Sequence, residues 1–179
     1  MNNIIKIKSS DIFLNNYTLN KNIKLYDKTN GTLLFVVGKH GTGKTKLLLK
    51  LAKVVLNPKL NILYISLDKT KQEFESENTI IKNDNFLTIY ISASTSIEDI
   101  EEFIRATGTG NIVIIDYIQL INTNSKEDRA GAIDLSVDKL KSLKEELGVT
   151  IFVSSQLGES LEINPKYIEN ADSIILIEE

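Results

Sequence analysis

Residues 38–45 carry the pattern with the clearest chemical meaning in this sequence, G-x-x-x-x-G-K-[ST]. Glycines at this spacing allow a tight turn whose backbone N–H groups converge on phosphate oxygens, next to the N-terminus of a following helix. Lys44 would reach the β- and γ-phosphates of a nucleotide, and the Thr45 hydroxyl would bind Mg²⁺. The expected phosphate-binding residues are Gly38, Lys39, His40, Gly41, Thr42, Gly43, Lys44 and Thr45.

Three polar side chains follow apolar runs that read as buried strands. Asp116 ends the run 112–115, and beside a complete phosphate-binding loop we expect this carboxylate to hold the magnesium shell. Asp68 follows another such run and could polarise the water that attacks the γ-phosphate, although an Asp here could equally cap the next helix. Gln156 ends a third run and could contact the γ-phosphate, the alternative being a surface polar residue.

The elements that must position these residues alternate along the chain. Short apolar runs predict strands, and apolar residues at helical spacing predict helices between them. This alternation predicts an α/β fold with a mostly parallel sheet and helices on both faces, in which ligands bind at the carboxyl ends of the strands. We expect strands at 33–37, 61–66, 86–91, 111–116, 149–154 and 173–177, and helices at 44–56, about 69–77, 96–106 and about 129–147.

Two segments are expected. Residues 1–30 are rich in Asn and Lys and predict a short N-terminal arm whose pairing the sequence does not assign. Residues 31–179 predict one nucleotide-binding domain with an adequate core. Ser96 followed by Asp99 predicts the start of one helix, and Gly148 predicts the end of another.

Composition excludes several classes of function. The chain has no cysteine and His40 is its only histidine, so disulfides, thiolate metal sites and Ser-His-Asp triads are not expected. A net charge of −3 does not favour a domain whose main task is to grip a nucleic-acid backbone. No apolar run approaches the about 18 residues that a membrane span needs. We expect a cytoplasmic protein without a membrane partner.

Several of these segments resemble the motor domain of bacterial replicative hexameric helicases, the DnaB family. Asp116-Tyr117-Ile118-Gln119-Leu120-Ile121 is very similar to the family's Walker B segment. Ser66-Leu67-Asp68 is similar to its Ser-Leu-Glu, and Ser155-Gln156-Leu157 follows its strand that ends in Gln. The likeness covers roughly residues 30–177. It implies a RecA-like P-loop ATPase core that uses ATP and Mg²⁺.

The resemblance also implies roles for individual residues. Lys44 and Thr45 would bind the nucleotide, Thr45 and Asp116 would hold Mg²⁺, Gln156 would be the sensor, and position 68 would carry the catalytic acid. Assembly with further copies, as a hexamer by analogy, or with a helicase ring is implied as well.

Four departures from the family pattern point in one direction. Asp68 is one methylene shorter than the family's Glu, and a 1 Å misplacement can cost about 100-fold in rate. Residues 158–162 are acidic where the family has a long basic DNA-binding loop. The sequence ends at Glu178-Glu179, where the family continues into a basic hairpin with an arginine finger, and no primase-binding N-terminal domain is expected. Of the two arginines, Arg105 and Arg129, Arg129 is the better candidate for a contact between subunits, the alternative being a solvated charge at a helix end.

These features favour an ATP-binding protein related to the helicase motor, with weak or partner-dependent hydrolysis in DNA replication. The nucleotide would then act mainly as a conformational or assembly switch. Two alternatives remain: a minimal ring-forming DNA helicase or translocase, and a non-catalytic accessory subunit that regulates a full-length helicase. Single-stranded DNA is expected to bind weakly at most. A phosphate-loop small-molecule kinase is a weaker alternative, because two arginines hardly provide an arginine-bearing lid.

Overall fold

A computed structural model describes residues 3–14, 25, 27, 29–55, 61–68, 72–73, 86–90, 95–107, 112–122, 129–158 and 162–179. One seven-stranded sheet crosses the molecule, in the order β1-β7-β2-β6-β5-β3-β4. Every pair of neighbouring strands in it is parallel. The strands are β1 (Asn3–Lys8), β2 (Thr32–Gly38), β3 (Ile62–Ser66), β4 (Phe86–Tyr90), β5 (Ile112–Asp116), β6 (Thr150–Gln156) and β7 (Ser173–Glu178).

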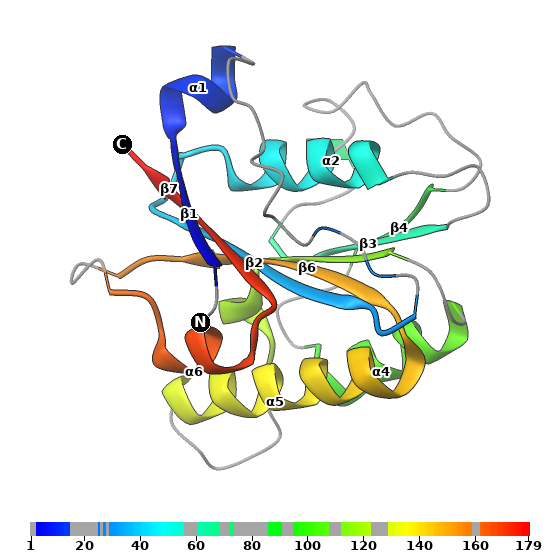
Figure 1. Ribbon diagram of the computed structural model, residues 1–179. Coiled ribbons are helices and arrows are strands. Elements are labelled where there is room, and N and C mark those ends of the chain that lie inside the picture. The colour runs from blue at the N-terminus through cyan, green and yellow to red at the C-terminus, as the bar shows by residue number, and fades with distance from the viewer. Residues whose placement is uncertain are drawn as a thin grey trace.

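Helices cover both faces of this sheet (Figure 1). On one face lie α1 (Ser9–Leu14) and α2 (Lys44–Val55). On the other lie α4 (Ile97–Thr107), α5 (Arg129–Leu147) and α6 (Pro165–Asn170). A short 3₁₀ helix, η1 (Ile118–Leu120), follows β5 directly. The α/β fold with a parallel sheet and helices on both faces is therefore confirmed.

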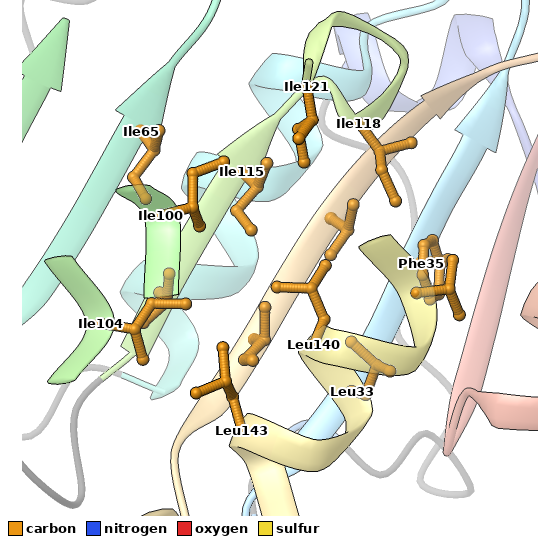
Figure 2. Packing of buried hydrophobic residues seen from close by; sticks show 14 of the residues in the cluster. Leu33, Phe35, Ile65, Ile100, Ile104, Ile115, Ile118, Ile121, Leu140 and Leu143 are labelled. Atoms are coloured by element: carbon orange, nitrogen blue, oxygen red, sulfur yellow. The ribbon is translucent and has the colours of Figure 1, made fainter. Parts of the chain in front are cut away.

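Each face of the sheet has its own hydrophobic core, because successive side chains of a strand point to opposite faces. In β2, Leu33 and Phe35 belong to the core under α4 and α5, whereas Leu34 and Val36 belong to the core under α2. Figure 2 shows Leu140 of α5 among the first group. Strands buried on both faces explain why the sequence shows uninterrupted apolar runs here.

The N-terminal residues join the sheet. β1 pairs with β7 along its whole length, from Asn3 opposite Ser173 to Lys8 opposite Glu178. Lys6 adds an ion pair of 2.6 Å to Glu178. Residues 3–8, which belong to the expected arm of residues 1–30, thus form an edge strand in the same sheet as the strands of residues 31–179.

Most expected elements lie within two residues of the observed ones, and α5 has the expected bounds. Ser96 and Asp99 cap α4 reciprocally, since the Asp99 carboxylate accepts the Ser96 N–H at 2.9 Å and the Ser96 hydroxyl accepts the Asp99 N–H at 3.1 Å. Gly148, with a φ of 65°, follows the end of α5 as expected. The expected helix at about 69–77 lies outside the described residues except for 72–73, and α1, η1 and α6 were not predicted.

Among the described residues, no helix is both long enough and apolar enough to cross a membrane.

Candidate functional site

The loop 38–45 joins the end of β2 to the first turn of α2. Gly41 and Gly43 have φ values of 77° and 93°, a region that residues with side chains rarely adopt. Gly38 is required for a different reason, because a Cβ there would lie 2.7 Å from the Thr42 hydroxyl. That hydroxyl donates to the Lys39 carbonyl at 2.9 Å. The glycines and the hydrogen bond of the Thr42 hydroxyl together stabilise the tight turn of the loop.

Lys44 lies inside the turn. Its ammonium donates to the carbonyls of Gly38 at 2.9 Å and Lys39 at 2.6 Å. Burial lowers the pKa of Lys44, and the charges of Asp116 and Asp68 act in the opposite direction. The ammonium is thus held by backbone carbonyls of the loop, with the charges of two carboxylates acting on it.

Asp116, the last residue of β5, is 3% exposed and accepts hydrogen bonds from three hydroxyl groups. The Thr45 hydroxyl donates to Oδ2 at 2.5 Å, and the Tyr64 hydroxyl donates to the same oxygen at 2.7 Å. The Ser154 hydroxyl donates to Oδ1. The peptide bond between Asp116 and Tyr117 is cis. The structure therefore brings together the two residues that we predicted for Mg²⁺.

Thr45 and Asp116 offer oxygen ligands of the kind that Mg²⁺ prefers. The described residues contain no cluster of three or more His, Cys, Asp or Glu side chains that could hold a metal ion by themselves. A Mg²⁺ ion at this place would need waters and phosphate oxygens to complete its shell, as is usual for magnesium in nucleotide sites. The donor set fits such an ion.

Asp68 follows β3 and is exposed. The preceding residue, Leu67, donates its N–H to the Asp116 carbonyl at 2.9 Å, so the two strand ends are tied together. Asp68 therefore lies at the same edge of the sheet as the loop. Its catalytic role stays a prediction, and the alternative role as a helix cap concerns a helix that lies largely outside the described residues.

Gln156 is the last residue of β6 and stands opposite Gly38 in the register of β2 and β6. Its neighbour Leu157 donates its N–H to the Gly38 carbonyl at 3.1 Å. These pairings bring the expected sensor next to the loop 38–45. The Gln156 side chain is exposed. Gln119 holds its backbone, since the Gln119 amide accepts the N–H of Gln156 at 3.2 Å and donates to its carbonyl at 2.9 Å.

Two expected loop residues lie at the surface. His40 is exposed, and Lys39 forms an ion pair of 2.7 Å with Glu179. Neither contributes a side chain to the group around Asp116 in the contacts described above. Their place in the binding set stays a prediction that rests on the backbone of the loop.

Of the two arginines, the structure describes the side chain of Arg105 only. Arg105 of α4 binds Glu146 of α5 through two hydrogen bonds of 2.7 Å and also binds Glu101. This network lies on the helical layer opposite α2, away from the phosphate-binding loop (Figure 1). The side chain of Arg129 lies outside the described residues, and so do residues 159–161 of the expected acidic loop.

Sequence reasoning missed Tyr64, Ser154 and the contact made by Gln119. A signal existed for the first two: each lies two residues before the end of its strand, on the face that α2 covers. A hydroxyl at that place on strands β3 and β6, which flank β5, can reach a carboxylate at the end of β5.

Comparisons with known proteins support this description of the fold. One solved structure, of an ATPase domain, has a TM-score of 0.70 at 19% identity, over 99% of this chain and 77% of that chain. The solved structure of a DnaB-like replicative helicase, described with its interactions with primase, has a TM-score of 0.68 at 21% identity, over 96% of this chain and 51% of that chain. At these identities the likeness concerns the fold, which is the RecA-like P-loop ATPase fold.

The chain also matches part of the length of curated relatives. "DNA repair protein RadA" of Rickettsia felis is 27% identical over 154 residues, which are 83% of this chain and 34% of the relative. RadA of Halalkalibacterium halodurans is 28% identical over 155 residues, which are 83% of this chain and 33% of the relative. The chain thus spans about a third of the length of these relatives.

A family model described as "DnaB-like helicase C terminal domain" matches residues 74–167, just over half of the 179 residues. The matched segment contains Asp116 and Gln156 but begins after the phosphate-binding loop. Because the loop, the parallel sheet and this match agree, the chain belongs to the family of DnaB-like helicase C-terminal domains.

Proposed function

We propose that this protein binds ATP with Mg²⁺ at residues 38–45. The observation that carries the proposal is the 2.5 Å hydrogen bond between the Thr45 hydroxyl and the Asp116 carboxylate. This contact supports the proposal, because two side chains that touch could both reach one Mg²⁺ ion. The glycines of the neighbouring loop have backbone conformations of the kind that a phosphate cradle requires.

Within this proposal, hydrolysis is weak or depends on a partner. Asp68 is the candidate acid and lies at the correct edge of the sheet, but it is one methylene shorter than Glu. Arg105 pairs with Glu101 and Glu146 on the helical layer opposite α2, so it is a poor candidate for a contact with the transferred phosphate in the same subunit. Bound nucleotide would act mainly through Gln156 as a conformational or assembly switch in DNA replication.

The test is a titration of purified protein with ATP, with Mg²⁺ and with EDTA, by isothermal calorimetry. Lys44→Ala removes the ammonium inside the loop and should abolish binding. Lys53→Ala, an exposed lysine on the same helix, is the matched control and should bind as the wild type does. Unchanged affinity in Lys44→Ala would sink the site assignment.

A minimal ring-forming DNA translocase is the second candidate. The family match and the likeness to a solved replicative helicase favour it. It requires hydrolysis that single-stranded DNA stimulates, measured on the same preparation together with native mass spectrometry. Stimulation in a ring of identical subunits would replace the switch proposal with this motor. Binding to a full-length helicase ring without turnover would instead identify an accessory subunit.

A further inference from the structure

The phenol of Tyr64 belongs to none of the motifs that predicted the site, yet it touches the central carboxylate. Tyr64 is 0% exposed and donates its hydroxyl to Oδ2 of Asp116 at 2.7 Å. Its register partner on β5 is Ile114, whereas the partner of Asp116 is Ser66. Two residues of strand correspond to about 6.5 Å, so the contact needs a side chain as long as tyrosine.

The three hydroxyl groups around Asp116 determine how its carboxylate is oriented. Oδ2 accepts hydrogen bonds from both Thr45 and Tyr64. Ser154 donates to Oδ1. Thr45 comes from the loop–helix junction, whereas Tyr64 and Ser154 come from β3 and β6, the strands on either side of β5. The sheet itself therefore holds the carboxylate towards the loop.

Tyr64 can only act as a donor in this contact. A carboxylate oxygen offers only lone pairs, so the hydrogen in this contact belongs to the phenol. A protonated hydroxyl facing a buried carboxylate is a charge-assisted hydrogen bond, which is the stronger kind.

We propose that Tyr64 is a positioning residue that aims the Asp116 carboxylate at Mg²⁺. The inference rests on the proposed function, since it assigns Tyr64 a role at the same nucleotide site. It makes a specific distinction: Tyr64 should matter for the part of the nucleotide affinity that depends on Mg²⁺. It should not matter for the contacts between the phosphates and the loop.

The experiment measures the affinity for ATPγS by calorimetry, once with Mg²⁺ and once with EDTA. Tyr64→Phe removes only the hydroxyl and should weaken binding roughly tenfold with Mg²⁺, as is typical for residues that orient a metal ligand. Binding with EDTA should stay unchanged. Tyr167→Phe is the matched control, because it removes another buried hydroxyl, one that accepts from Ser155 rather than donating to Asp116.

A melting curve of each variant shows whether it is folded. Ser154→Ala is the second variant, which tests the other carboxylate oxygen with a smaller change and should reduce the same Mg²⁺-dependent gain. Two results would overturn the role of Tyr64 but leave the proposed function standing. One is an equal loss of ATPγS affinity with Mg²⁺ and with EDTA, and the other is a Mg²⁺-dependent gain in affinity that neither variant changes. A wild-type protein that binds no nucleotide would overturn the proposed function and this inference with it.

Discussion

The side-chain amide of Gln119 binds the backbone of Gln156 on both of its polar groups. It accepts the N–H at 3.2 Å and donates to the carbonyl at 2.9 Å. The same amide nitrogen donates to the Ser155 hydroxyl at 2.8 Å. Because η1 directly follows β5, this contact connects the segment after Asp116 to the end of β6 beside the phosphate-binding loop.

Replacing Gln119 by Ala should lower the free energy of unfolding by about 1 kcal/mol, since the backbone partners are partly exposed and can bind water instead. Urea unfolding measures this change. Gln156→Ala is the control, because it removes an exposed side chain and leaves the backbone groups that Gln119 binds. Equal destabilisation by both substitutions would contradict this account of the contact.

Two buried threonines, Thr32 and Thr150, have hydroxyl groups without a hydrogen-bond partner among the described residues. They are register partners on β2 and β6, and both are 0% exposed. The loss of hydration is therefore not offset, so Thr150→Val should raise the free energy of unfolding by about 1 kcal/mol.

The matched control for this prediction is Thr150→Ser, which keeps the hydroxyl and removes the buried methyl group. It should lower stability by about 1 kcal/mol. Thermal melting of both variants compares the two effects directly. Destabilisation by valine would mean that the hydroxyl has a partner that the described residues do not include.

The ion pairs between α4 and α5 predict a pH dependence of stability. The bond from Lys139 lowers the pKa of Glu101, and Arg105 lowers it further, although partial burial acts against both. Arg105 likewise lowers the pKa of Glu146. A lowered pKa means that the stabilisation is complete above 4.5, the ordinary value for Glu, and is lost as the pH falls through the lower value in the folded state.

Glu101→Gln should therefore destabilise the protein near neutral pH and lose this effect in acid. Urea unfolding at several pH values between neutral and about pH 3 measures the difference from the wild type. Glu102→Gln, an exposed neighbour on the same helix, should show little difference at any pH. A Glu101→Gln effect that is constant with pH would show that the ion pairs do not contribute.

Much of the fold follows from local patterns in the sequence. The strand that ends at Asp116 and the helix over residues 129–147 were predictable, because continuous apolar runs and helical spacing depend on neighbours along the chain. The six-residue α6 left a signal too, since Asn164 accepts the Lys166 N–H at 2.8 Å with Pro165 at the first turn.

The contacts around the site were not predictable in the same way. Tyr64 reaches Asp116 across 52 positions of sequence, and Gln119 reaches Gln156 across 37. Such contacts depend on the order and register of strands, which the apolar pattern does not specify. The place of β1 beside β7 is another example, because the first and last strands become neighbours only when the sheet is complete.

Substitutions at Asp68 can distinguish between the two roles that its sequence position allows, a catalytic acid and a helix cap. Leu67 donates its N–H to the Asp116 carbonyl, so Asp68 lies at the edge of the sheet that also carries the loop 38–45. If it is the catalytic acid, Asp68→Asn should lower ATP turnover by roughly 100-fold and leave ATP affinity within about twofold. If it only caps a helix, Asn should replace it without loss, because Asn caps a helix as well as Asp does.

Asp68→Glu completes the test, since it carries the carboxylate one methylene further. A short acid that limits hydrolysis predicts a rise in turnover, because small errors in position are costly in rate. Steady-state phosphate release by the wild type and both variants, with melting curves as the check on folding, measures all three outcomes. Turnover that neither variant changes would exclude Asp68 from catalysis. ATP binding without measurable turnover in all three proteins would instead favour the accessory subunit, in which nucleotide is bound but not consumed.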